Sequence, residues 1–200
     1  SRDQRILIFG AGTMGLITAL FASARGLRVD LLEKNESKIK RIKPFVETID
    51  STCTKEIHAG EYDIVINCCG DFIAFAQAIT KLDKAGQLSF FSGISKNESL
   101  ETNLLNLLHY KETVLTGVYG MTRGHIRNAI PFIESCKHQF RQLIQDVVSL
   151  EQVPGLMPRI LAGEHLKFVI DLQQQFQKVH SADSAPPHSA EVIVDAALST

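Results

Sequence analysis

Three glycines at fixed spacing, with an apolar run before them and a helical pattern after them, are the residues of this chain best placed to do chemistry. The spacing glycine–any–glycine–any–any–glycine is typical of a turn that receives a pyrophosphate. The first glycine permits a sharp bend, the second lets the anion approach the backbone, and the third lets the next helix pack closely. The N–H groups and the positive dipole end of that helix then face the phosphates. The residues expected to surround the pyrophosphate are Gly10, Gly12, Thr13, Met14 and Gly15.

An acidic residue stands where the ribose of a dinucleotide needs one. The helical pattern runs from about Thr13 to Arg25, and residues 28–32 form a second predicted strand that ends in Glu33. A carboxylate about 20 residues after the glycines can accept hydrogen bonds from the adenosine ribose hydroxyls. It would also repel a 2′-phosphate, so Glu33 favours NAD over NADP. A basic cluster keeps NADP open as the alternative: Lys34, Lys38, Lys40 and Arg41.

The bulk composition is that of an ordinary soluble protein. The chain has 200 residues, 44% of them hydrophobic and 22% charged, with a net charge of −1. This length suffices for one sizeable domain, or for one domain and part of another. The balanced charge offers no electrostatic footprint for nucleic acid or for an anionic membrane. No apolar stretch is long enough to span a bilayer and no signal peptide opens the chain, so a cytoplasmic protein is expected.

Neither the cysteines nor the histidines stand at the spacing of a metal site. The four cysteines have neither disulfide-framework nor zinc-knuckle spacing, and the seven histidines are scattered. Adjacent Cys68 and Cys69 are expected to be small core residues. A reducing cytosol suits free thiols, and no metal ligand is predicted in this chain.

Strand-like and helical segments alternate up to about residue 136, which predicts an α/β fold with a doubly wound parallel sheet. Residues 63–69 are almost entirely apolar, as a strand buried on both faces of a parallel sheet requires. We expect the strand order 3-2-1-4-5-6, with residues 113–119 at an edge. The other predicted strands are 45–49 and 87–92, and the predicted helices are 37–43 (stopped by Pro44), 55–59, 72–82, 103–109 and 122–136.

The C-terminal part does not continue this sheet. Residues 145–150 and 166–171 are strand-like and residues 152–162 helical, which predicts a small strand–helix–strand remnant. Beyond residue 172, a glutamine run and a segment rich in serine, alanine and proline are typical of a flexible linker. The predicted domains are an NAD(P)-binding Rossmann domain over 1–137, a C-terminal segment over 138–172 and a tail over 173–200.

The order of these pieces resembles the coenzyme-binding half of the medium-chain dehydrogenase/reductase superfamily, closest in pattern to its zinc-type alcohol and polyol dehydrogenases. The resemblance runs from about Arg5 to Leu172 and rests on the order and spacing of its motifs. These motifs are residues 10–15, Glu33, residues 63–70, 82–93 and 111–120, the helix after 122–123, and residues 163–171.

The resemblance implies a role for each matching residue. The segment 10–15 would hold the pyrophosphate, and Glu33 would bind the adenosine ribose, where the family usually has aspartate. Lys38 resembles the lysine that often reaches the same ribose, and a surface lysine is the alternative. The remaining residues are Cys69 and Gly70, which would line the cofactor cleft, and Gly93, Ile94, Val118 and Tyr119, which would border the nicotinamide, with core packing as the alternative for Tyr119.

The resemblance also implies what this sequence lacks. Members of this type carry their catalytic zinc ligands and proton relay in a separate domain before the Rossmann fold, and no residue here matches that domain. The cofactor supplies the hydride chemistry, so no catalytic residue is predicted. This chain alone is expected to be inactive, with zinc, if any, in the absent domain. The strands at 145–150 and 166–171 have then lost their partner sheet, and we expect them to pair with each other, fold back on the core or be disordered.

Three functions stay open for the whole protein. The first is an oxidoreductase that transfers a hydride between NAD and a secondary alcohol, such as a polyol or sugar alcohol. The second is a zinc-free reductase of the same superfamily that acts on enones or quinones. The third is a non-catalytic module that binds NAD(H) or senses redox state. The edge strand 113–119 carries no proline and no charge between its ends, so we expect it to pair with a second copy in a homodimer, as the resemblance also implies.

Overall fold

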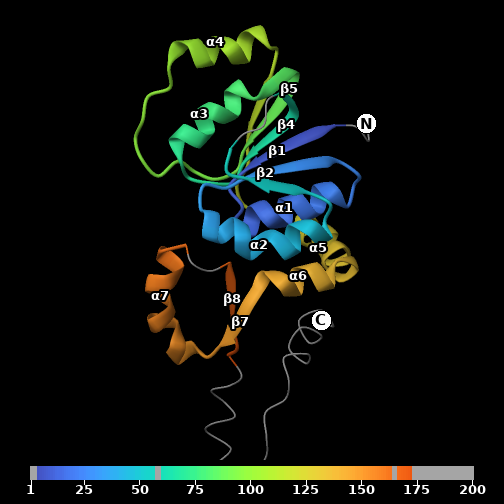
Figure 1. Ribbon diagram of the computed structural model, residues 1–200, viewed down its shortest axis with the longest axis vertical. Coiled ribbons are helices and arrows are strands. Elements are labelled where there is room, and N and C mark those ends of the chain that lie inside the picture. Colours follow the sequence, from blue (N-terminus) through green and yellow to red (C-terminus); the bar gives the residue numbers. More distant parts are fainter. Residues whose placement is uncertain (1–3, 57–59, 164–165, 173–200) are drawn as a thin grey trace, which may run out of the picture. The chain divides into compact units, whose positions relative to one another are not determined.

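The computed structural model describes residues 4–56, 60–163 and 166–172 (Figure 1). Residues 55–56 of the predicted helix 55–59 form a bend. The rest of that helix and the predicted tail over 173–200 lie outside the described residues. The chain divides into two compact units, Ser1–Gly120 and Met121–Thr200, and each is described by itself. The domain boundary at residue 137 stays a prediction.

A six-stranded parallel sheet forms the centre of the first unit, with the order β3-β2-β1-β4-β5-β6. This confirms the predicted α/β fold and its strand order. The direction in which the chain adds strands reverses between β1 and β4, and open α/β sheets bind ligands in the crevice at such a point. The strands are β1 (Arg5–Phe9), β2 (Arg28–Leu32), β3 (Thr52–Thr54), β4 (Tyr62–Asn67), β5 (Leu82–Phe90) and β6 (Val114–Gly117).

Helices cover both faces of this sheet (Figure 1). Phe75 of the third helix belongs to one buried cluster with Phe9 and Val65. The first helix approaches the opposite face, where an ideal Cβ on Gly15 would lie 3.5 Å from Cγ2 of Ile8. Strand β1 is therefore buried on both sides, which explains its unbroken apolar run. The helices are α1 (Thr13–Ser23), α2 (Glu36–Thr48), α3 (Phe72–Thr80) and α4 (Thr102–Tyr110).

Helix α2 corrects two expectations. The helix does not stop before Pro44, and residues 45–48 are its last turn rather than part of a strand at 45–49. A proline inside a helix removes one hydrogen bond and crowds the preceding turn. Burial of one apolar face of α2 outweighs this cost, because tertiary packing overrides intrinsic propensity. The third strand is instead the short β3. The buried residues of α2 are Ile42, Phe45 and Val46.

Strand β5 also differs from its prediction. It begins at Leu82 rather than at residue 87, and α3 ends at Thr80 rather than at residue 82. The segment 84–86, between the predicted helix and the predicted strand, is an irregular part of β5 in which Ala85 has a φ of 58°. Glycine and a left-handed residue interrupt the pattern of a strand, so the sequence shows only its regular second half.

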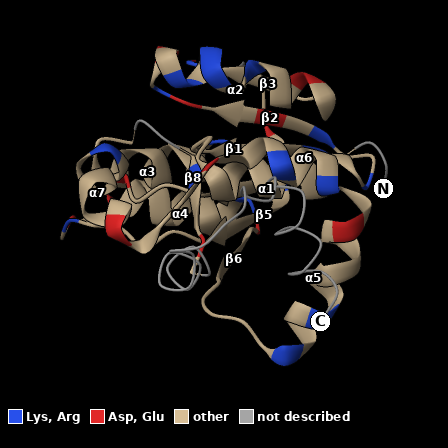
Figure 2. Cartoon of the chain, turned by 90° about the horizontal axis from the view of Figure 1, so that it is seen from below, with Lys and Arg blue, Asp and Glu red and all other residues tan. Residues whose placement is uncertain are grey.

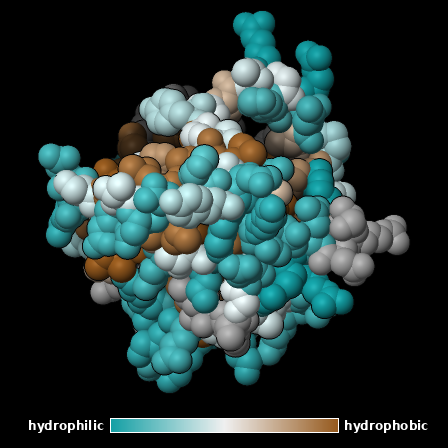
Figure 3. Space-filling view, turned by 90° about the horizontal axis from the view of Figure 1, so that it is seen from above, coloured by the Kyte–Doolittle hydropathy of each residue, from teal (hydrophilic) through white to brown (hydrophobic). Residues whose placement is uncertain are grey.

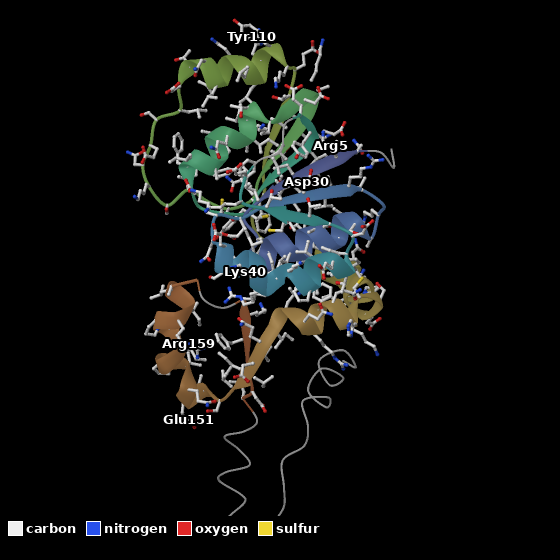
Figure 4. The ribbon with its side chains drawn as sticks, viewed as in Figure 1. Arg5, Asp30, Lys40, Tyr110, Glu151 and Arg159 are labelled. Atoms are coloured by element: carbon white, nitrogen blue, oxygen red, sulfur yellow. The ribbon has the colours of Figure 1, made fainter. Side chains whose placement is uncertain are left out.

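Polar side chains tie four strands together at their amino ends. Arg5 and Asp30 lie side by side (Figure 4), with 3.7 Å between guanidinium and carboxylate. The Asp30 carboxylate also accepts hydrogen bonds from the hydroxyls of Tyr62 at 2.9 Å and Thr52 at 2.6 Å. Burial and the bond to Asp30 raise the pKa of Tyr62 to about 12. These contacts stabilise the amino ends of the strands, whereas ligands bind at the carboxyl ends of the strands in this class of fold.

The second unit holds a separate two-stranded parallel sheet of β7 and β8. Of the three fates expected for these strands, pairing with each other is the one observed. The sequence indicated no helix at 137–143, where the short α6 lies. The elements are α5 (Arg123–Ser135), α6 (Lys137–Leu143), β7 (Ile144–Val148), the 3-10 helix η1 (Leu150–Gln152), α7 (Val153–Leu161) and β8 (Lys167–Ile170).

Candidate functional site

The glycine turn lies at the carboxyl end of β1, and two of its glycines are required by the fold itself. Gly10 has a φ of +94°, and an ideal Cβ there would lie 3.0 Å from Cβ of Cys69. An ideal Cβ on Gly15 would lie only 1.9 Å from the carbonyl oxygen of Gly10. A side chain at either position would therefore collide with the chain's own backbone or side chains.

Gly12 differs from the other two glycines, because no atom of the described residues lies within 4 Å of its ideal Cβ. The space beside it is open, and a ligand could use it. Gly12 is also the N-cap residue of α1, so it offers no side chain to cap the helix, and the first turn has no acidic residue. The protein's own groups therefore leave the positive end of this helix dipole available to an anion. Thr13, Met14 and Gly15 form this first turn.

Glu33 follows β2 and folds back onto the glycine turn. Its Oε2 accepts a hydrogen bond from the Ala11 N–H at 3.2 Å and pairs with Nζ of Lys38 at 2.5 Å, while Oε1 accepts the Asn35 N–H at 3.1 Å. The side chains of Glu33 and Lys38 are only 11% and 18% exposed. A carboxylate has about four acceptor positions. Three are filled, so Oε1 keeps room for one further donor such as a ribose hydroxyl.

The charge of Glu33 is fixed by these partners. Burial alone would raise the pKa of its carboxyl, but the bond from Lys38 and the backbone N–H groups of Asn35 and Ala11 outweigh it and leave the pKa below its ordinary value. Glu33 is therefore a carboxylate at neutral pH.

The glycine turn and Glu33 line one hollow of about 220 Å³. Its wall also includes Cys69, Lys34 and Asp71. The carboxylate of Asp71 caps α3 through the Ile73 N–H at 2.8 Å and pairs with the ammonium of Lys34. Hence the structure brings together the predicted residues Gly10, Gly12, Glu33, Lys38 and Cys69.

The basic cluster around this hollow is partly neutralised. Figure 2 shows basic residues along α2. Lys38 is paired with Glu33, and Lys34 with Asp71. Lys40 lies exposed on α2 (Figure 4) and does not line the hollow. Two of the cations that could have received a 2′-phosphate are thus already held by carboxylates.

Further predicted residues meet at the carboxyl ends of β4 and β5. An ideal Cβ on Gly70 would lie 3.0 Å from the carbonyl oxygen of Gly93. Ile94 and Cys69 pack against the buried core of the first unit. Cys69 is partly buried, and burial raises the pKa of its thiol, so it behaves as the small apolar residue expected from the sequence.

Val118 and Tyr119 follow β6 and do not line the hollow. The Val118 N–H donates to the carbonyl of Phe90 at 3.0 Å. The side chain of Tyr119 is fully exposed, so the alternative of a core residue is wrong. A place beside the nicotinamide stays a prediction for both residues.

The sequence reading missed two polar residues near the cleft. Asp71 was not singled out, although an acid directly before a helical pattern is a capping signal. Asn67 is fully buried at the end of β4, and its Oδ1 accepts the Cys69 N–H at 3.0 Å. Its Nδ2 finds no hydrogen-bond partner within the described ranges.

The residues that the structure describes contain neither a metal-binding group of side chains nor a membrane-spanning helix. Over 4–56, 60–163 and 166–172, no three or more His, Cys, Asp or Glu residues gather in a group that could hold a metal ion. Over the same ranges, no helix has the length and apolar character needed to cross a membrane.

Comparison with known proteins matches the chain to one family. The profile of the zinc-binding dehydrogenases matches residues 13–135. No curated protein gives a significant match.

Solved structures share the fold at low sequence identity. A putative zinc-binding dehydrogenase from Clostridium scindens has 18% identity and a TM-score of 0.68, covering 86% of this chain and 50% of that one. The structure of 2R,3R-butanediol dehydrogenase from Bacillus subtilis has 17% identity and a TM-score of 0.66, covering 84% of this chain and 50% of that one. The structure of S. aureus TarJ in complex with NADPH has 16% identity and a TM-score of 0.71, covering 86% of this chain and 56% of that one. The present chain thus spans about half the length of these structures.

Proposed function

The chain belongs to the zinc-binding dehydrogenase family, and from this premise we propose that it is the coenzyme-binding part of an NAD-dependent oxidoreductase. The observation that carries the proposal is the hollow in which the glycine turn and Glu33 meet. The uncapped start of α1 and the open space at Gly12 suit a pyrophosphate. The remaining acceptor position on Glu33 suits a ribose hydroxyl. The residues present therefore fit the cofactor.

We further propose NAD rather than NADP as the cofactor. Glu33 is a partly buried, fixed negative charge that a 2′-phosphate would approach. The nearest cations, Lys38 and Lys34, are already engaged with carboxylates. Relatives of similar fold bind the phosphorylated cofactor, since S. aureus TarJ was solved with NADPH and Haloferax mediterranei glucose dehydrogenase with NADP, so the choice needs a direct measurement.

The bound cofactor would supply the hydride chemistry, and this chain would hold and orient it. Gly12 and the first turn of α1 would bind the pyrophosphate, and Glu33 with Lys38 would bind the adenosine ribose. Gly70, Gly93, Ile94, Val118 and Tyr119 would lie toward the nicotinamide. The described residues hold no group of three or more side chains that could bind a zinc ion, and this chain alone is proposed to be inactive.

For the whole protein we propose a secondary alcohol as substrate, such as a polyol or sugar alcohol. Support comes from the sequence resemblance and from the shared fold of the butanediol dehydrogenase. A zinc-free reductase of enones or quinones is the alternative within the superfamily, and zinc ligands elsewhere in the protein would decide between them. A redox-sensing module is the alternative outside enzymes, and it would bind NADH and NAD⁺ with very different affinities.

Assembly and compartment belong to the same proposal. Strand β6 ends the sheet, and Val114 and Leu115 on it are 52% and 46% exposed. Figure 3 shows apolar side chains gathered within a mainly hydrophilic surface on the face that carries α4. We propose a homodimer through this edge. Four free cysteines, at positions 53, 68, 69 and 136, suit a reducing cytoplasm.

Calorimetric titration with NADH tests the proposed function. The unaltered chain should bind NADH, and Gly12→Val should weaken binding at least tenfold, because its side chain fills the space reserved for the pyrophosphate. The matched control is Gly155→Ala in α7, whose ideal Cβ also meets no atom of the described residues within 4 Å. Unchanged NADH affinity in the Gly12→Val variant would contradict the proposal.

A further inference from the structure

The hollow around Glu33 is too small for a whole adenosine. Its volume of about 220 Å³ lies below the roughly 300–1,000 Å³ of typical small-molecule pockets. A second hollow of about 850 Å³ adjoins it, lined in part by Ser95, Lys96 and the start of α3. Asp71 lines both hollows. Space for a larger ligand therefore continues past Asp71.

The chemistry of a nucleoside gives the direction of its base. The base and the 5′-phosphate leave the ribose from the two carbons that flank the ring oxygen. With the phosphate at Gly12 and the hydroxyls on Glu33, the base leaves on the side away from the glycine turn. Outside the glycine turn and Glu33, the lining of the smaller hollow includes Lys34, Asp71 and Ala74, and Asp71 also lines the larger hollow.

The carboxylate of Asp71 has partners on both of its oxygens. Oδ1 accepts the Ile73 N–H at 2.8 Å and so begins α3, while Oδ2 pairs with the ammonium of Lys34. The side chains of Lys34 and Asp71 are 66% and 35% exposed, so both are within reach of a ligand. The backbone N–H of Ala74 is a third partner, which leaves about one of the four acceptor positions of the carboxylate for a further donor. The methylene stem of Lys34 offers apolar surface beside it.

We propose that Asp71 selects the base of the cofactor, accepting a hydrogen bond from the exocyclic amino group of adenine while the stem of Lys34 packs beside the ring. This inference rests on the proposed function, because it takes Glu33 as the partner of the ribose. The cleft then prefers a 6-aminopurine to a 6-oxopurine, since an oxygen at that position meets a carboxylate with no proton to share.

Two probes differ only at this position: NADH and reduced nicotinamide hypoxanthine dinucleotide. Calorimetry on the 200-residue chain should show NADH binding about tenfold more tightly, the ratio expected from one hydrogen bond to a charged acceptor. In Asp71→Asn the ratio should fall to about one or reverse, because the amide keeps an oxygen for the helix cap and presents N–H donors in place of Oδ2.

Lys34→Met separates this role from a merely structural one. It breaks the same ion pair but leaves the Asp71 carboxylate, so the preference for NADH should persist. Glu36→Gln is the matched control, because it breaks the nearby exposed ion pair of Glu36 and Lys55 at 2.7 Å. It should change neither the affinity for NADH nor the affinity for the hypoxanthine dinucleotide. Asp71→Ser also retains a capping side chain, and it replaces Asp71→Asn if that variant does not fold.

The outcomes are distinct. If NADH does not bind to the unaltered chain, both the proposed function and this inference fail. If NADH binds but the ratio stays at its original value in Asp71→Asn or Asp71→Ser, only the assignment of Asp71 is wrong. Loss of the preference in Lys34→Met as well would reduce Asp71 to a structural partner and overturn the inference.

Discussion

Glu33 is long enough to reach back from the end of β2 to the glycine turn, where the Ala11 N–H donates to it. The proposed ribose acceptor and the turn proposed to hold the pyrophosphate are therefore joined by a hydrogen bond within the protein. Lys38 pairs with the same oxygen, so its ammonium is held beside the carboxylate that we propose as the ribose ligand. The resemblance indicated the residue types, and the side-chain contacts show how they constrain one another.

Replacing Glu33 with alanine should narrow the preference for NADH over NADPH by about tenfold. The change removes both a charged hydrogen-bond acceptor and the repulsion of a 2′-phosphate, and it releases Lys38 to meet that phosphate. Calorimetric affinities for the two cofactors measure the ratio. Glu36→Ala, a nearby acid that pairs with Lys55, serves as the control. An unaltered chain that prefers NADPH would show that the basic cluster decides the choice instead.

At the scale of elements, α2 shows where tertiary packing overrules a local signal. Pro44 lies exposed within a helix whose other face is buried. Pro44→Ala should restore a donor to the helix and raise the free energy of unfolding by about 1–2 kcal/mol, after allowance for the freer unfolded chain. Urea denaturation measures it. Pro154→Ala in the first turn of α7 should give no such gain, and equal gains in both variants would contradict this account.

The elements that the sequence predicted well are those with a regular pattern and a clear stop. The apolar β1 and the second strand at 28–32 were placed correctly, and the glycines marked the turn between β1 and α1. The sequence pattern predicted the wrong bounds where an element continues past a residue that usually ends it, at Pro44 in α2 and at the irregular start of β5. It gave no sign of the hollow that continues past Asp71, because no local pattern encodes which loops meet across a sheet.

At the scale of the molecule, β6 leaves one edge of the sheet unpaired within the described residues. The Val118 N–H donates inward to Phe90, and alternation along the strand then turns the Leu115 N–H outward. Sedimentation should show a dimer, and Leu115→Pro should weaken it by removing an outward donor while sparing the sheet. Leu115→Val keeps the N–H and should remain dimeric. A monomer at high concentration before any mutation would rule out this assembly.

The glycines at positions 12 and 15 of the turn should tolerate substitution differently. At position 15 an ideal Cβ would lie 1.9 Å from a backbone oxygen, whereas at position 12 it would meet nothing within 4 Å among the described residues. In a library of all single substitutions, position 15 should be depleted when cells are sorted for abundance of the protein. Position 12 should tolerate that sort and be depleted only when cells are sorted for cofactor capture. Two selections on one short motif would thus separate the residues that serve folding from those that serve the ligand.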